Sequence, residues 1–246
     1  MRVYMAATSC LRKQPELMEI CDYFLESFIS IEDWQMPYFK KAKGFLLDSG
    51  AFTFMNGGTH KNLKKYAEKY ANFVKDNDIR DFFELDVESI VGWDEYLRIN
   101  DMIDNITQRK SIPVFHKNRG FEWFENTCKQ VDYISFGGVA VARGGQKKKI
   151  IDVMPIFINT AHKYNTRIHG LGFTATTMLD KIPFDSVDSS SWTMGQRMGL
   201  LYRFTGNNIK YYRPQSHGKR MKNADDVARH NFVEWIKYQR YAEACL

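Results

Sequence analysis

The sequence has 246 residues, of which 44% are hydrophobic and 15% aromatic, a composition that excludes a disordered chain and allows a full core. The formal net charge of +6 and a pI near 9.0 favour a polyanionic partner. No stretch approaches the ~18 apolar residues of a membrane span, and the first residues lack an apolar export signal. We therefore expect a cytoplasmic protein with no membrane partner.

Short apolar runs along the chain each end in a cluster of polar residues or glycines. Such continuous apolar runs are typical of buried parallel strands, and in an α/β barrel the reactive groups lie at the carboxyl ends of the strands. Residues 2–8 predict a first strand and residues 209–214 a last one. The six runs between them, expected to form one active-site rim, are 44–52, 82–89, 111–117, 133–140, 167–173 and 184–192.

Segments with helical spacing of apolar residues separate these runs. Strands that alternate with helices predict parallel pairing with right-handed crossovers, and the length suits the roughly 250 residues of an eightfold barrel. The predicted fold is a single (β/α)8 TIM barrel over residues 1–246. An open doubly wound sheet is the main alternative, although no Gly-x-Gly-x-x-Gly turn supports it. The predicted helices are 15–28, 61–76, 93–109, 121–130, 147–164, 174–180, 194–204 and 224–243.

Four aspartates stand at or near the ends of these runs: Asp48, Asp86, Asp185 and Asp188. For any one of them alone, a helix N-cap or a turn is the simpler interpretation. Several carboxylates gathered in one cleft repel each other, an arrangement typical of sites where they act on a ligand. Paired aspartates suit chemistry at an anomeric carbon, where one attacks the carbon and another transfers a proton.

The sequence predicts no metal site. Its cysteines form no close pair, which favours reduced thiols over disulfides or zinc ligands. Neither His-x-His nor His-Glu-x-x-His occurs. We expect catalysis without a metal or an organic cofactor. The cysteines are Cys10, Cys21, Cys128 and Cys245.

Six segments between residues 44 and 192 resemble, in the same order, segments of the tRNA-guanine transglycosylases (queuine tRNA-ribosyltransferases). The most specific are DSGAF (48–52) and GGVAV (137–141). The resemblance implies base exchange at a nucleotide: an aspartate attacks the anomeric carbon, guanine leaves, and a 7-deazaguanine enters the covalent intermediate. The other segments are Asp86, PVFH (113–116), HGLGFT (169–174) and FDSVDSSSW (184–192).

The resemblance also implies roles for individual residues. Asp188 matches the nucleophile, with Asp185 as the adjacent alternative, and Asp48 would transfer a proton near the base. Asp86 would accept hydrogen bonds from guanine, and His116, which stands where the family has Gln, would donate to O6. The remaining predicted contacts with the base come from Ser49, Gly50, Phe52, Gly137, Gly138, Val139 and Gly170.

The chain departs from the tRNA enzymes in lacking their cysteine-rich zinc motif. It therefore resembles the compact phage and mobile-element enzymes that place 7-deazaguanines into DNA, and we expect DNA, with single-stranded or flipped guanine, rather than tRNA. The apolar Val139 favours 7-cyano-7-deazaguanine as the incoming base. Trp192, Tyr211 and Tyr212 are candidates for stacking on bases or for the core. Predicted phosphate contacts, which solvated surface charge would also explain, are Lys117, Arg119, Arg143, Lys147, Lys148, Lys219 and Arg220.

Two other functions fit the same residues. A nucleoside N-glycosidase or deoxyribosyltransferase would use the carboxylates without needing the basic loops. A non-catalytic nucleic-acid-binding partner subunit would keep the basic residues but tolerate loss of Asp48 and Asp188.

Overall fold

The computed structural model describes residues 1–55, 62–138, 145–173, 175–213 and 223–246. Its main sheet contains eight parallel strands in the order β4-β3-β2-β1-β8-β7-β6-β5, and β9 and β10 form a separate two-stranded sheet. The strands are β1 Arg2–Ala6, β2 Tyr23–Ser27, β3 Gly44–Asp48, β4 Asp81–Phe82, β5 Val114–Phe115, β6 Tyr133–Phe136, β7 Arg167–Gly170, β8 Ser186–Ser189, β9 Leu201–Phe204 and β10 Ile209–Tyr212.

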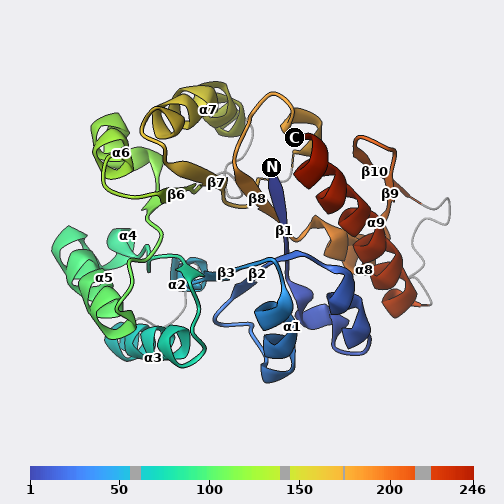
Figure 1. The fold of residues 1–246 in the computed structure, drawn as a ribbon, viewed down its shortest axis with the longest axis horizontal. Coiled ribbons are helices and arrows are strands. Elements are labelled where there is room, and N and C mark those ends of the chain that lie inside the picture. Colours follow the sequence, from blue (N-terminus) through green and yellow to red (C-terminus); the bar gives the residue numbers. More distant parts are fainter. Residues whose placement is uncertain (56–61, 139–144, 174, 214–222) are drawn as a thin grey trace.

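The main sheet is curled, and helices surround it (Figure 1). Side chains from strands far apart in the sheet order meet inside the curl: the rings of Tyr4 on β1 and of Phe83, just after β4, lie 5.9 and 5.5 Å from the His169 ring on β7. At the two edges, Ile112 N–H donates to Phe82 O at 2.8 Å and Glu84 N–H donates to Ile112 O at 3.0 Å. This parallel α/β architecture is compatible with a TIM-like barrel.

The helices pack their apolar faces against the outside of the sheet. In α3, for example, Leu63, Ala67, Tyr70, Ala71 and Val74 are buried while the lysines between them are exposed, which is the pattern of an amphipathic helix. The helices are α1 Met36–Lys41, α2 Ala51–Met55, α3 Leu63–Asp76, α4 Glu88–Val91, α5 Trp93–Thr107, α6 Gly120–Cys128, α7 Gly145–Lys163, α8 Met194–Met198 and α9 Ala224–Cys245.

Most predicted elements are confirmed, but the helix predicted over 15–28 is wrong. Residues Pro15–Ile20 form a short 3-10 helix and Tyr23–Ser27 form β2, a central strand of the sheet. The spacing of Ile20, Cys21, Phe24 and Leu25 fits a helix face, but Tyr23, Phe24 and Leu25 are all buried, as expected for a strand covered on both faces.

The predicted last strand, 209–214, is also placed differently. Residues Ile209–Tyr212 form β10, which pairs antiparallel with β9 outside the main sheet. The helix predicted over 194–204 ends at Met198, and its second half is β9. Over 174–180 the described residues form only the 3-10 turn Thr176–Met178. The main sheet therefore reaches eight strands by including β2, and residues 209–214 are not part of it.

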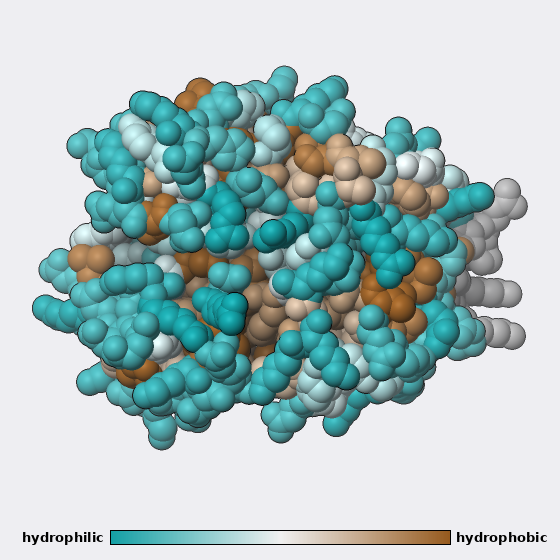
Figure 2. Space-filling model, in the orientation of Figure 1, coloured by the Kyte–Doolittle hydropathy of each residue, from teal (hydrophilic) through white to brown (hydrophobic). Residues whose placement is uncertain are grey.

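The surface in Figure 2 is mainly hydrophilic, with small hydrophobic areas separated by polar ones. Across the described ranges, no helix combines the length and the apolar character needed to cross a bilayer.

Candidate functional site

Three of the predicted aspartates are electrostatic neighbours. Asp48 is the last residue of β3, Asp86 follows β4, and Asp188 is the third residue of β8. Burial raises the pKa of Asp48 to about 6, and the negative charges of Asp86 and, more weakly, Asp188 add to this shift; hydrogen bonds from Ser27 and from the backbone of Gly50 oppose it. Like charges affect one another this way only when they lie close together in a poorly solvated place.

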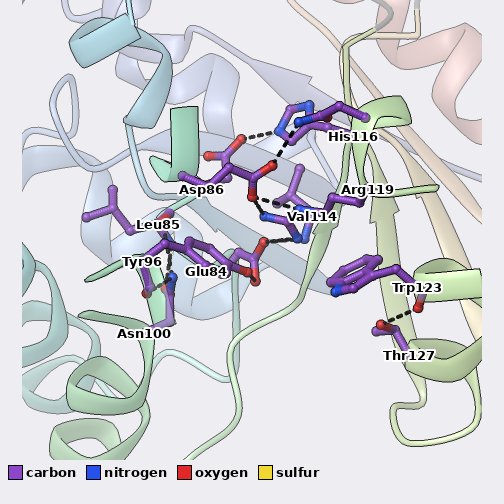
Figure 3. Close-up of polar contacts among 12 residues, drawn as sticks. Glu84, Leu85, Asp86, Tyr96, Asn100, Val114, His116, Arg119, Trp123 and Thr127 are labelled. Carbon is purple, nitrogen blue, oxygen red and sulfur yellow. Dashed lines mark hydrogen bonds and ion pairs between the residues drawn. The ribbon is translucent and has the colours of Figure 1, made fainter. Parts of the chain in front are cut away.

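Asp86 is paired with His116, which follows β5. His116 Nε2 lies 2.6 Å from Asp86 Oδ2, and the two side chains are 24% and 11% exposed (Figure 3). A carboxylate only accepts hydrogen bonds, so Nε2 carries the proton of this contact. Gly137 leaves space for the imidazole, because a Cβ there would stand 2.9 Å from His116 Cε1.

Asp188 is held by two donors at one oxygen. Its Oδ1 accepts hydrogen bonds from His169 Nε2 at 3.2 Å and from the Gly172 N–H at 2.5 Å. Asp188 and His169 are 7% and 0% exposed. Within the described ranges no hydrogen-bond donor reaches the other oxygen, Oδ2.

A buried chain of hydrogen bonds continues from His169 away from Asp188. Ser186 Oγ lies 2.7 Å from His169 Nδ1 and 2.6 Å from the Tyr133 hydroxyl. Because Nε2 donates to Asp188, the neutral imidazole accepts at Nδ1, so Ser186 donates to His169 and Tyr133 donates to Ser186. These hydrogen bonds therefore hold the His169 ring in the orientation in which Nε2 faces Asp188.

Asp185 lies away from these carboxylates. It precedes β8, and its Oδ2 accepts a hydrogen bond from Ile168 N–H at 2.7 Å and lies 3.0 Å from His162 Nε2. The Arg2 N–H donates to its carbonyl, which places Asp185 at the amino end of the strands. Asp185, the alternative candidate for the nucleophile, is therefore separated from Asp188 along β8 by about 10 Å.

The turn after β3 brings backbone groups to Asp48. The Gly50 N–H donates to Asp48 Oδ2 at 3.1 Å, and Gly50 has a φ of +78°, which favours glycine. The Ser49 hydroxyl is buried and has no hydrogen-bond partner among the described residues. Phe52, predicted to stack on the base, is 58% exposed.

The predicted base-edge glycines border a small apolar cavity. Gly137 and Gly138 line it with Lys117 and the aromatic residues of β5, β6, α6 and α7, and its volume is about 330 Å³. Gly138 has a φ of +84°. Gly170, at the end of β7, packs closely against Phe184, since a Cβ there would stand 2.9 Å from the Phe184 ring.

Arg119 is buried, which corrects its predicted role in phosphate binding. Its side chain is 2% exposed and pairs with Glu84 at 2.9 Å (Figure 3). It also pairs with Glu88. Its guanidinium lies over the Tyr96 and Trp123 rings, 4.8 and 4.5 Å from their centres. A cation so enclosed is a structural element of the β4–β5 region and is not available to a ligand.

The other predicted phosphate contacts are less constrained. Lys117 and Lys148 are exposed, and Lys147 lies in the first turn of α7. The remaining predicted contacts lie outside the described residues: Val139 for the base, and Arg143, Lys219 and Arg220 for phosphates.

No group of three His, Cys, Asp or Glu side chains in the described ranges is arranged as metal ligands.

Sequence reasoning missed His169, Ser186 and Glu84. A signal was present for Ser186, because it stands two positions before Asp188 on one strand, and side chains two apart share a face. His169 interrupts an otherwise apolar run, which is a weaker signal.

A scan against protein-family models and a search of curated proteins found no match to this chain.

Proposed function

We propose that this protein is a transglycosylase that exchanges guanine in DNA for a 7-deazaguanine, on a sheet closed into a (β/α)8 barrel. The observation that carries the proposal is the state of Asp188: one oxygen is held by His169 and Gly172, and no donor among the described residues reaches the other. An oriented, buried carboxylate with one open oxygen is suited to attack on an anomeric carbon.

In the proposed reaction Asp188 Oδ2 forms a bond to C1′ of the nucleotide while the bond from C1′ to the guanine nitrogen breaks. Asp48 donates a proton to the departing base, and its carboxylate then removes a proton from the incoming 7-deazaguanine, whose nitrogen displaces Asp188 from C1′. Atoms and charges balance without a further reactant. The raised pKa of Asp48, about 6, suits a group that both donates and accepts a proton near neutral pH.

Asp86 and His116 are the proposed contacts for the base edge. Asp86 would accept from the N1–H and the 2-amino group of guanine. His116 Nε2 already serves Asp86, so donation to guanine O6 from Nδ1 requires the protonated imidazole. In the neutral form Nδ1 is an acceptor and would suit a second donor of the base instead.

Base exchange on free deoxynucleosides is a second candidate. The buried position of Arg119 removes one predicted phosphate contact and favours this alternative. The two functions differ in their response to salt, because only the reaction on a polymer depends on many phosphate contacts.

The test is incorporation of labelled guanine into single-stranded DNA, duplex DNA, tRNA and free deoxyguanosine, with 7-cyano-7-deazaguanine as competitor. The Asp188→Asn variant should lose at least about 10³-fold in rate, whereas Asp185→Asn, at the other end of β8, should stay within a few-fold of the unmodified protein. A covalent protein–DNA adduct, trapped on a denaturing gel only when Asp188 is present, would support the mechanism. Labelling that is equal in all variants, or absent from every substrate, would overturn it.

A further inference from the structure

The β9–β10 hairpin lies outside the main sheet. It follows β8, and its inner strand is fixed to α9 (Figure 1). Tyr202 N–H donates to Asn231 Oδ1 at 2.8 Å, and Phe204 N–H donates to Glu234 Oε2 at 2.7 Å. Each of these bonds joins the backbone of β9 to a side chain of the helix, so the hairpin is held in place along its length.

The two faces of the hairpin differ in character. Tyr202 and Ile209 point toward α9 and are 7% and 8% exposed. Because side chains alternate along a strand, Arg203 and Lys210 lie on the opposite face together with Tyr212. Arg203 and Lys210 are exposed, and Tyr212 is 51% exposed, so it is not part of the core.

The outer face carries two cations directly opposite one another. Arg203 and Lys210 are register partners in the antiparallel pair, and like charges in this position repel one another. Neither forms an ion pair with a described acidic residue, and Arg213, also exposed, follows at the end of the hairpin. Many other surface cations are paired, as Lys237 is with Glu234 and Arg98 with Glu95.

We propose that the outer face of this hairpin binds the backbone of the nucleic acid that carries the target base. A phosphate placed between Arg203 and Lys210 would relieve their repulsion, and Tyr212 beside them offers a ring on which a base can stack. The inference deepens the proposed function, on which it rests for the identity of the polymer. Binding measurements alone can test the role of the hairpin, whereas the proposed function needs a measurement of base exchange.

Lys210→Glu separates docking from folding. The new carboxylate would stand opposite Arg203 as an attractive pair, so the thermal midpoint should stay unchanged or rise. Affinity for a fluorescein-labelled single-stranded DNA, measured by anisotropy at about 50 mM salt, should fall about tenfold or more because a phosphate contact becomes a repulsion. Lys64→Glu on α3 makes the same charge change at an exposed position away from the hairpin and should lose much less.

A second variant tests the number of contacts. The double change Arg203→Gln and Lys210→Gln should reduce the slope of log affinity against log salt by about 1.4 for a single strand. Tyr212→Ala should weaken binding about tenfold with little change in this slope.

The proposal is overturned if no DNA or tRNA binds, or if Lys210→Glu and Lys64→Glu weaken binding equally. Salt-dependent binding that depends on the hairpin, in a protein that exchanges no base, would uphold this inference and reject the proposed function. Base exchange that is unaffected by all hairpin variants, with unchanged binding, would do the reverse.

Discussion

His169 donates a hydrogen bond to Asp188 from a ring that is completely buried inside the curled sheet. The rings of Tyr4, Phe83 and Tyr133 surround the imidazole, and Ser186 occupies its other nitrogen. The imidazole therefore has little freedom to rotate, and its hydrogen bond restricts the rotation of the Asp188 carboxylate as well. We regard His169 as a positioning residue, since it reaches the reacting atoms only through Asp188.

His169→Phe keeps an aromatic ring in this cluster and removes both polar contacts. We expect kcat of base exchange to fall about 10- to 100-fold, because the attacking oxygen is no longer held, while KM changes little. His169→Gln, whose amide can both donate and accept, should restore part of the loss. Equal kcat in the Phe and Gln variants, with both folded by urea titration, would exclude a positioning role.

Asp48 should make the protein less stable at neutral pH than in mild acid. Its pKa is about 6 when folded against 3.8 for the ordinary group, so between these pH values the folded state binds more protons than the unfolded state. This contribution to stability is present at low pH and is lost as pH rises through 6. Asp48→Asn should raise the free energy of unfolding by about 1–3 kcal/mol at pH 8.

The pH dependence of that difference is the decisive measurement. Urea unfolding of both proteins across the acid range should show the gain of Asp48→Asn shrinking below pH 6 and vanishing near the ordinary aspartate pKa of 3.8. A gain of the same size at every pH would mean that Asp48 titrates normally in the folded protein.

Arg119→Met should destabilise the fold without a direct effect on phosphate binding. The change leaves Glu84 and Glu88 without their cation in a buried place, and breaking such a pair costs about 3–5 kcal/mol. Arg98→Met removes an exposed pair with Glu95 and should cost less than about 1 kcal/mol. If Arg119→Met unfolds like the unmodified protein but loses its salt-dependent DNA affinity, the residue is a phosphate ligand after all.

Gly137→Ala should weaken binding of the base through His116. The added Cβ would stand 2.9 Å from the imidazole and would push it away from Asp86. We expect KM for the incoming base to rise about tenfold with kcat less affected, since the lost contact acts in binding. In a His116→Ala background the same Gly137→Ala change should have little further effect, because nothing is left to displace; additive effects would contradict this explanation.

The apolar runs that end in polar residues predicted seven of the eight strands of the main sheet. They could not reveal β2, because Asp22 interrupts the apolar run before Tyr23. The apolar residues Ile20, Cys21, Phe24 and Leu25 also fit one face of a helix. Helix and strand propensities could not resolve this ambiguity. The burial of Phe24 and of its neighbours Tyr23 and Leu25 in the folded protein decides for a strand.

The candidate site was predictable to the level of strand ends but not to the level of partners. Asp48 and Asp188 could be identified from their runs, while the difference between Asp185 and Asp188 depends on where a four-residue strand begins. The burial of Arg119 could not be predicted from the sequence, because its partners come from three other segments: Glu84 after β4, Tyr96 on α5 and Trp123 on α6. Only the folded chain brings these together.

The pairing of β1 with β8 has a consequence for synthesis of the chain on the ribosome. Val3 lies opposite Val187 in the sheet, and Gln239 on α9 donates to the Val3 carbonyl at 2.7 Å. β1 must therefore wait for partners that are made about 180 and 235 residues later. Until they emerge, its open edge and apolar side chains are targets for incorrect pairing, so chaperone binding to the nascent chain should concentrate on β1 and β2.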